Sequence, residues 1–250
     1  MKKTEVIYGV HSVKAVMERR GEDILELYIS MNRDRGSLAS IVQLADELGL
    51  KPQDVKSTTL DAMADSPQHQ GVAIKCRQTK TYDEGWFWRK VVEERVSAAP
   101  PLVVVLEGVT DPHNLGAVFR SADGVAADAV VVAKRNSAHL SPAVHKVSVG
   151  ASQMVPFVVA NDLPEFVRTL SSKGLKTVGL AVGGRSDPLY DLPLQEPCAM
   201  VFGAEGRGLS ARMLSACDVV GYIPMAGYVD SLNVSVAVGV SLFEVQRQRR

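Results

Sequence analysis

From Pro101 onward, short apolar runs rich in β-branched residues alternate with segments of helical pattern, and this alternation strongly constrains the fold. Apolar strands separated by helices are typical of a parallel sheet covered on both faces. The sequence therefore predicts an α/β domain whose ligands bind outside the carboxyl ends of the strands. We expect strands at 102–108, 129–133, 156–160, 176–182, 198–203 and 219–225, and a last helix from Ser231 toward the C-terminus.

The first part of the chain has its own pattern of short elements. We expect helices at 11–20 and 37–49 and strands at 24–30 and 71–76. A charged and aromatic stretch follows and ends in Pro100-Pro101; its aromatic residues are expected to pack against a domain. The predicted domains are an N-terminal unit at 1–78, a linker at 79–99 with some helix, and a main domain at 100–250.

Composition excludes several classes of protein and site. The 28 basic and 28 acidic residues cancel, so an argument for a nucleic-acid partner must rest on local features. The three cysteines are expected to be reduced, and neither Cys-x-x-Cys nor His-x-x-x-His spacing occurs, so we expect no metal site. The longest apolar stretch, "VSVAVGVSL", is too short for a membrane span, and the N-terminus does not resemble a signal peptide. We expect a cytoplasmic protein with no membrane partner.

The first loop of interest is "DPHNLGAVFRSAD", which follows the first predicted strand of the main domain. Asn114 is expected to cap the helix that begins there. Arg120 lies six residues later, nearly two helical turns on, and is expected to face the same side as Asn114. The alternative is that Asn114 only caps and that Arg120 only pairs with an acid such as Asp123.

Two further loops follow predicted strands on the same sheet edge. "VFGAEGRGLS" places Glu205 among glycines but lacks the spacing of a dinucleotide-binding fingerprint. "IPMAGYVDSLNVS" ends in Ser231, which is expected to cap the last helix, and Asn233, which capping does not explain. Glycines and small polar residues on three loops predict a compact polar ligand held largely by backbone.

These three stretches, in this order, resemble the three motifs of the SpoU (TrmH-type) RNA ribose 2′-O-methyltransferases. "IYGVHSVKAVMERR" and "HQGVAI" resemble the small RNA-binding domain of the RlmB subgroup, whose members methylate a guanosine ribose in 23S ribosomal RNA. The resemblance therefore covers essentially the whole chain. It implies a small α/β RNA-binding domain followed by a parallel-sheet methyltransferase domain with a knotted (SPOUT-type trefoil) C-terminal segment.

The resemblance also implies S-adenosyl-L-methionine as cofactor, 23S ribosomal RNA as partner and a homodimer. The catalytic residues that it implies are Asn114, Arg120, Glu205, Ser231 and Asn233. The cofactor contacts that it implies are Gly203, Ile223 and Leu232. Arginine is nearly always protonated, so Arg120 acts either as a base in a strongly perturbed site or as an electrostatic partner for the developing alkoxide.

Two positions depart from the family pattern. Gln153 stands where relatives often carry Glu, and Asp230 stands where a small residue is common, which puts substrate fit in doubt. Three other functions remain: a transfer RNA methyltransferase, a non-catalytic RNA-binding assembly factor, and a dehydrogenase. The intact set of motif residues argues against the second, and the missing fingerprint argues against the third. The basic residues expected to follow RNA phosphates lie near the domain junction: Lys75, Arg77, Lys80, Arg89 and Lys90.

Overall fold

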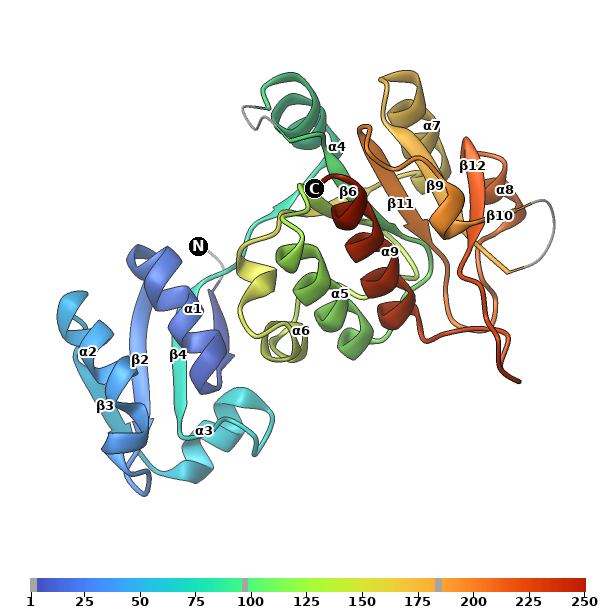
Figure 1. The fold of residues 1–250 in the computed structure, drawn as a ribbon. Helices are drawn as coiled ribbons and strands as arrows, with labels where there is room; N and C mark the ends of the chain where they lie inside the picture. The colour runs from blue at the N-terminus through green and yellow to red at the C-terminus, as the bar shows by residue number, and fades with distance from the viewer. Residues whose placement is uncertain (1–3, 96–98, 183–185) are drawn as a thin grey trace. The chain divides into compact units, whose positions relative to one another are not determined.

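The structure is a computed structural model that describes residues 4–95, 99–182 and 186–250. The described chain forms two compact units (Figure 1). The first contains residues up to Lys80 together with Leu140–Met154, and the second contains Thr81–His139 and Val155–Arg250. Within the described residues, no helix is both long enough and apolar enough to cross a membrane.

The first unit is built on a four-stranded mixed sheet with strand order β1-β4-β2-β3. Alternate residues of a strand face opposite sides, so Val72 and Ile74 contact the core under α1 and α2, whereas Ala73 contacts α3. The helices and strands expected at 11–20, 24–30, 37–49 and 71–76 are confirmed. The elements are β1 (Thr4–Tyr8), α1 (Val10–Arg20), β2 (Ile24–Ser30), α2 (Ala39–Glu47), β3 (Pro52–Val55), α3 (Ser57–Ala64) and β4 (Val72–Arg77).

The segment between β7 and β8 of the second unit belongs structurally to the first. Its helix α6 (Pro142–Val147) and the following 3-10 turn (Ala151–Gln153) contact β1 and α1. Buried His145 bonds Glu5 through Nε2 at 3.1 Å and Ser152 through Nδ1 at 2.8 Å. Gln153, one of the two departures from the family pattern, accepts a hydrogen bond from Thr79 at 2.8 Å and also contacts Arg20.

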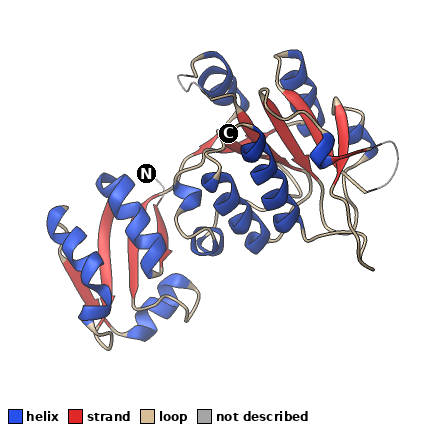
Figure 2. Cartoon of the chain, in the orientation of Figure 1, coloured by secondary structure: helices blue, strands red, loops and turns tan. Residues whose placement is uncertain are grey.

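The second unit is built on an eight-stranded parallel sheet with order β10-β12-β9-β11-β6-β7-β8-β5, which confirms the α/β class (Figure 2). The predicted strands are all present, although those expected to reach 108, 182 and 225 end earlier. Its strands are β5 (Thr81–Tyr82), β6 (Leu102–Leu106), β7 (Ala129–Ala133), β8 (Phe157–Ala160), β9 (Lys176–Leu180), β10 (Asp187–Pro188), β11 (Cys198–Phe202) and β12 (Val219–Tyr222).

Helices cover both faces of this sheet, which explains why its central strands are apolar throughout. On one face, alternate strand residues such as Val103 and Val201 share a core with Phe166 and Met213. On the other face, α5 packs against α9, and α9 contacts β11. The helices are α4 (Glu84–Phe87), a π-helical turn (Trp88–Glu93), α5 (Pro112–Gly124), α7 (Leu163–Ser172), α8 (Ala211–Leu214) and α9 (Val234–Gln248).

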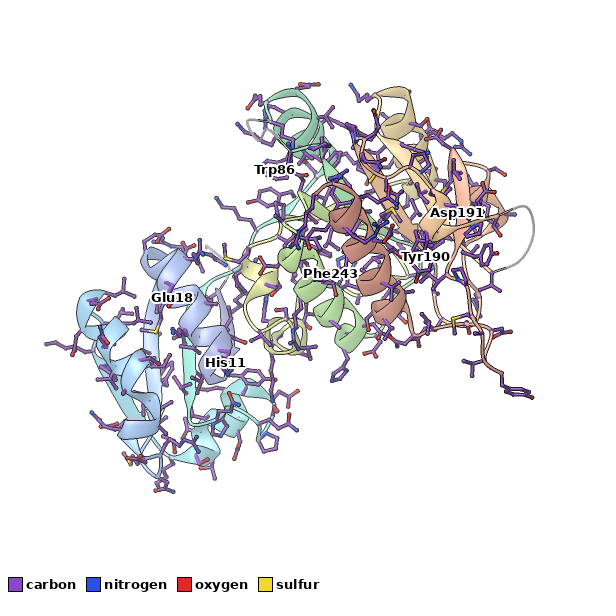
Figure 3. All side chains as sticks on the ribbon, viewed as in Figure 1. His11, Glu18, Trp86, Tyr190, Asp191 and Phe243 are labelled. Atoms are coloured by element: carbon purple, nitrogen blue, oxygen red, sulfur yellow. The ribbon has the colours of Figure 1, made fainter. Side chains whose placement is uncertain are left out.

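The stretch expected to link the two domains is largely structured and packs within the second unit. Phe87 and Val91 are buried in its core, and Trp86 stacks on Tyr82 with 3.8 Å between ring centroids (Figure 3). The expectation that these aromatic residues pack against a domain is confirmed. Residues 96–98, at the end of the expected linker, lie outside the described residues.

Candidate active site

The three motif loops follow β6, β11 and β12 at one edge of the sheet. Strand β11 lies between β9 and β6, and β12 borders β9. Because all these strands are parallel, their carboxyl ends meet at the same edge. The order of strands therefore brings the first loop beside two loops whose cluster residues lie 91 and 119 positions further along the chain.

Asn114 is free to reach across this edge because it is not the helix cap, contrary to the prediction. Asp111 is the N-cap of α5 and accepts a hydrogen bond from the His113 N–H at 2.9 Å. Pro112 occupies the first turn, where its missing N–H costs nothing. The hydrogen bond from the His113 backbone lowers the pKa of the Asp111 carboxyl below its ordinary 3.8.

Asn114, Glu205 and Asn233 form one hydrogen-bonded cluster. The Asn114 Nδ2 atom donates to Glu205 Oε1 at 3.2 Å, and Asn233 Nδ2 donates to Asn114 Oδ1 at 3.0 Å. Asn233 Nδ2 also donates to Glu205 Oε1. One residue from each motif loop thus contributes to a single polar cluster, and both amides donate to the same carboxylate oxygen.

Asn233, and not Ser231 as predicted, caps the last helix. The helix begins at Val234, and Asn233 Oδ1 accepts hydrogen bonds from Ser235 N at 2.9 Å and Ser235 Oγ at 2.6 Å. Because the amide oxygen is used by the cap, the amide nitrogen faces Glu205. Asn233 therefore fixes the start of α9 and completes the cluster, a double role that explains an Asn at this position.

The glycine-rich loop after β11 is held in a conformation that only glycine allows at Gly203. A Cβ atom there would lie 2.1 Å from the carbonyl carbon of Gly208. Gly206 and Gly208 have φ values of 74° and 63°, in the left-handed region that favours glycine. The Gly208 N–H donates to Ala204 O at 2.9 Å, so the loop doubles back and presents Glu205 at its tip.

Glu107 fixes the far end of this loop, a role that the sequence analysis missed. Its carboxylate accepts hydrogen bonds from Ser210 N and Ser210 Oγ, both at 2.8 Å. Ser210 is also the N-cap of α8. The sequence feature that could have indicated this role is a carboxylate directly after a buried strand, at the same sheet edge as the motif loops.

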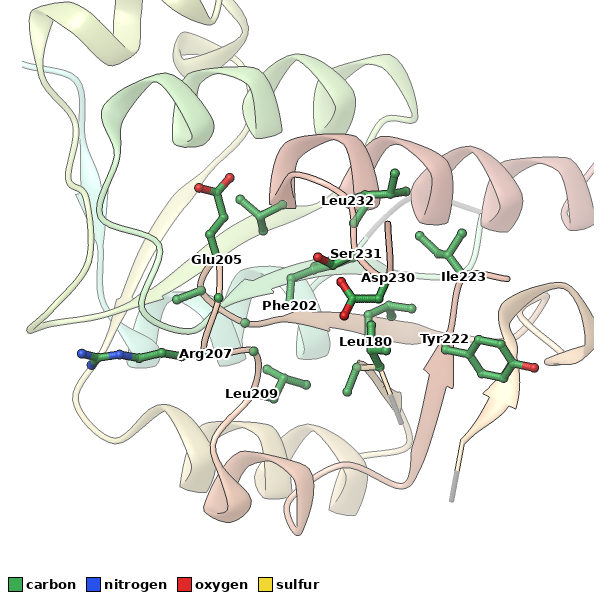
Figure 4. Close-up of a pocket in the computed structure, with 18 of the residues that line it drawn as sticks. Leu180, Phe202, Glu205, Arg207, Leu209, Tyr222, Ile223, Asp230, Ser231 and Leu232 are labelled. Atoms are coloured by element: carbon green, nitrogen blue, oxygen red, sulfur yellow. The ribbon is translucent and has the colours of Figure 1, made fainter. Parts of the chain in front are cut away.

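A pocket of about 670 Å³ opens beside the cluster, over the carboxyl ends of β9, β11 and β12 (Figure 4). This volume lies within the range of roughly 300–1,000 Å³ that is typical of small-molecule sites. Its walls combine apolar side chains with the backbone of the motif loops. The lining includes Leu180, Phe202, Gly203, Glu205, Leu209, Ile223, Asp230, Ser231, Leu232 and Asn233.

Arg120 stands apart from this cluster. It is exposed on α5 and, within the described residues, makes no hydrogen bond or ion pair. The alternative in which Arg120 serves only as an ion-pair partner of Asp123 therefore has no support from the geometry. The structure places Asn114, Glu205 and Asn233 in contact and Ser231 in the adjoining pocket, whereas Arg120 points to solvent.

The chain is similar to known proteins along its whole length. Residues 101–243 match the model of the SpoU rRNA Methylase family, and residues 6–82 match the model for RNA 2'-O ribose methyltransferase substrate binding. The chain is 39% identical, over all of both chains, to the 23S rRNA (guanosine-2'-O-)-methyltransferase RlmB of Shewanella oneidensis.

Solved structures share the fold along almost the whole chain. A crystal structure of an RNA 2'-O ribose methyltransferase is 26% identical, with a TM-score of 0.79 over 99% of this chain and 90% of that one. The SpoU methyltransferase AviRb from Streptomyces viridochromogenes, in complex with AdoMet, is 22% identical, with a TM-score of 0.78 over 98% and 90% of the two chains. The family model and the full-length relative both show that this chain belongs to the SpoU rRNA methylase family.

Proposed function

We propose that the chain transfers a methyl group from S-adenosyl-L-methionine to the ribose 2′-hydroxyl of a guanosine in 23S ribosomal RNA. The observation that carries this proposal is the cluster of Asn114, Glu205 and Asn233 beside the pocket, in a chain 39% identical end to end to an enzyme with that named activity. The test is transfer of a labelled methyl group to a transcript of 23S ribosomal RNA, followed by mapping of the modified nucleotide. Such a substrate implies a cytoplasmic enzyme.

The pocket suits S-adenosyl-L-methionine in both shape and chemistry. Leu180, Leu209 and Leu232 provide apolar walls for a flat base, and Gly203 and Ile223 bring backbone close to the bound molecule. Backbone N–H and C=O groups at strand ends can bond the polar atoms of a nucleoside and an amino-acid group. When bound, S-adenosyl-L-methionine supplies an electrophilic methyl group. The assigned cofactor contacts are Gly203, Ile223 and Leu232.

The chain's own residues then orient the RNA and stabilise the charge that develops on the 2′-oxygen. Glu205 holds the two amides in place, and we assign to Asn114 and Asn233 the positioning of the ribose. Ser231, in the pocket wall, is assigned to the same group of catalytic residues. Arg120 lies six residues after Asn114 on α5 and makes no ion pair with any described residue. We assign to it electrostatic stabilisation of the developing alkoxide.

The two halves of the chain divide the work in this proposal. Residues 1–78 hold the substrate RNA, and the domain at 100–250 carries out methyl transfer. Support comes from the substrate-binding model that matches residues 6–82 and from a separate core in the first unit. A chain lacking the first 78 residues is expected to bind the methyl donor and to lose affinity for RNA; unchanged RNA affinity would contradict the division.

A homodimer formed through α9 is part of the proposal. Val236 and Phe243, seven residues apart and so on one side of this helix, are 50% and 52% exposed (Figure 3). Large apolar side chains on one helix face are typical of a protein interface. Light scattering of the intact protein at micromolar concentration is expected to give twice the chain mass, and Phe243→Glu is expected to halve it.

We further propose that the C-terminal segment is knotted, as in the family. Support comes from the path of the chain after β12: residues 223–233 line the pocket together with the loop at 203–208, and α9 then packs against α5 and β11. A threaded segment would tie the start of α9 to the pocket. Unfolding and refolding rates of the intact chain test this, because threading adds a slow refolding phase.

A further inference from the structure

Three of the five basic residues that were expected to follow RNA phosphates near the domain junction are paired with carboxylates. Lys75 pairs with Glu26 at 3.1 Å, Arg77 pairs with Asp23 at 3.3 Å, and Lys90 pairs with Glu94. A cation already paired with a carboxylate attracts a phosphate less, because its charge is largely compensated locally. Of the five residues expected there, only Lys80 and Arg89 lack an ion pair among the described residues.

Unpaired cations gather instead at the sheet edge that carries the candidate active site. Arg207 follows β11, and Lys134 and Arg135 follow β7. All three are exposed, and the described part of the chain gives their side chains no hydrogen bond, ion pair or aromatic partner. Elsewhere in the second unit most cations are engaged: Arg95 with Asp128, Arg168 with Glu165, Arg212 with Asp162, Arg247 with Glu244, Lys173 over Trp88, and Arg249 with backbone carbonyls.

The strand order places Lys134 and Arg135 on the side of the cluster away from the pocket, whereas Arg207 is one of the residues that line the pocket. The pocket lies over β12, β9 and β11, whereas the unpaired cations follow β11 and β7, which flank β6. Neighbouring strands are about 4.8 Å apart, so the three strands β11, β6 and β7 span roughly 10 Å. The two halves of the edge meet at the loop after β11, where Glu205 bonds Asn114 and Asn233.

Backbone hydrogen bonds hold the loop after β7 in place beside the first motif loop. Ala138 N donates to Val109 O at 2.8 Å, and Lys134 N donates to Ala160 O at 3.0 Å. Asn136 has a φ of 56°, an unusual conformation for a residue other than glycine, and this turns the chain just after Arg135. Lys134 and Arg135 therefore sit on a fixed loop and not on a free segment.

The carboxylates on the neighbouring loops have partners of their own. Glu107 is held by Ser210, Asp111 caps α5, and Glu205 is held by the two amides of the cluster. In Figure 4 the side chain of Arg207, one of the pocket-lining residues, extends away from Ser231 and Leu232. Among the described residues these three cations lack a partner, and so does Asp230, which lies in the pocket wall on the loop after β12.

We propose that Lys134, Arg135 and Arg207 form a phosphate-binding row that holds the backbone of the RNA beside the nucleotide to be methylated. This inference rests on the proposed function, because it assigns the second substrate of the same site. Exposed Lys and Arg without partners bind phosphate oxygens independently of base sequence, and they fix the register of the RNA. The row would place the target ribose beside the cluster and leave the pocket to the methyl donor.

The experiment uses the full chain and a single-stranded fragment transcribed from 23S ribosomal RNA. Affinity is measured over a range of salt concentrations for the wild type, the double variant Lys134→Gln/Arg135→Gln, Arg207→Gln and the control Arg89→Gln. Arg89 is also an unpaired arginine of the second unit, but it lies in the π-helical turn and belongs to the junction group expected from the sequence. All four positions are exposed, so thermal unfolding is expected to be unchanged.

A plot of log affinity against log salt concentration has a negative slope. For single-stranded RNA, each lost phosphate contact reduces the magnitude of this slope by about 0.7. The magnitude of the slope is therefore expected to decrease by about 1.4 in the double variant and by about 0.7 in Arg207→Gln. Arg89→Gln is expected to keep the wild-type slope. In steady-state kinetics the KM for RNA is expected to rise in the double variant, with the Kd of the methyl donor unchanged.

Three results test this inference, and the first and the last separate it from the proposed function. If the wild type methylates the RNA and the row variants keep its salt slope, the row is wrong and the proposed reaction stands. If Arg89→Gln alone lowers the slope, RNA follows the domain junction and the row is again wrong. If the slopes fall as expected but no variant, including the wild type, methylates the RNA, the row stands and the proposed reaction fails.

Discussion

Asn233 donates a hydrogen bond to Asn114 over 3.0 Å, and the two residues are 119 positions apart in the chain. The same Asn233 side chain caps α9 through its oxygen. This contact ties the start of the last helix to the first turn of α5. The placement of the candidate catalytic residues therefore depends on where α9 begins as well as on the sheet.

The double role of Asn233 can be separated by two substitutions. Asn233→Ser keeps a capping oxygen but loses the amide donor to Glu205, so we expect unfolding free energy to change by only a few tenths of a kcal/mol. Methylation is expected to fall by roughly a hundredfold, the loss typical of one positioned polar group. Asn233→Ala removes the cap as well and is expected to cost about 1 kcal/mol more. Equal activity in Asn233→Ser and wild type would show that the cap alone matters.

Gly203→Ala tests whether the loop after β11 needs a glycine. The new Cβ would lie within 2.4 Å of three backbone atoms of Gly208 and Leu209, so the loop must move. We expect methyl-donor affinity to drop at least tenfold in calorimetry. Gly239→Ala is the control, because its Cβ would meet only Ser121 Oγ at 3.5 Å inside a helix. That variant is expected to bind normally and to unfold at the same or a higher temperature; normal donor binding by Gly203→Ala would contradict the assigned pocket.

Arg120→Ala is expected to abolish methylation while leaving the methyl donor bound. Arg120 does not line the pocket, and loss of one charge at a developing oxyanion costs about 2.7–4 kcal/mol, or a hundred- to thousandfold in rate. Arg120→Lys is expected to rescue activity poorly, because an ammonium group cannot reproduce the planar donor fork. A raised KM for the donor with unchanged kcat would assign Arg120 to the cofactor instead.

The buried contact between Glu5 and His145 predicts an acid-sensitive first unit. Burial opposes ionisation of Glu5, yet hydrogen bonds from His145 and Thr79 hold its pKa below the ordinary 4.5. A carboxyl with a lowered folded-state pKa stabilises the protein above its ordinary pKa, and this stabilisation is lost as pH falls through the folded value. Arg20 donates a hydrogen bond to Thr79, which bonds Glu5, and Arg20 also pairs with Asp23 at 3.0 Å.

Denaturant unfolding at pH 7 and at pH 3 checks this expectation. Glu5→Gln is expected to be less stable than wild type at pH 7, and the difference is expected to shrink at pH 3, because below pH 4.5 the unfolded wild type takes up a proton at Glu5 more readily than the folded protein does. Glu18→Gln is the control, because Glu18 is exposed and makes only a surface pair with Lys14 at 3.6 Å. A Glu5→Gln difference that stays constant between the two pH values would rule out stabilisation by the ionised Glu5 carboxylate.

Local pattern was sufficient to predict the main sheet, because buried parallel strands such as β6 and β7 are uninterrupted apolar runs bounded by turn residues. The helix caps were less predictable. Both Asp111 and Asn114 are good capping residues, and the fixed geometry of Pro112 decided between them. Similarly, Ser231 and Asn233 both suit a cap, and only the contact with Glu205 selects Asn233.

Other features depend on tertiary structure that no local pattern records. The helical periodicity of α6 does not state which sheet it covers, and its docking on the first unit follows from buried His145 meeting Glu5. Ion pairing is equally hidden: Lys75 and Arg135 look alike in the sequence, but only Lys75 has a carboxylate across the sheet. The solvent-facing position of Arg120, away from the cluster, was likewise not predictable.

The central claim is methyl transfer to a guanosine 2′-oxygen by the cluster at the carboxyl edge of the sheet. The most direct measurement is mass spectrometry of 23S ribosomal RNA transcript after incubation with the protein and methyl-labelled S-adenosyl-L-methionine. We predict one labelled 2′-O-methylguanosine per transcript with the wild type and none with Arg120→Ala. Label on a base, label on transfer RNA alone, or no transfer by a wild-type protein that binds both substrates would contradict the account.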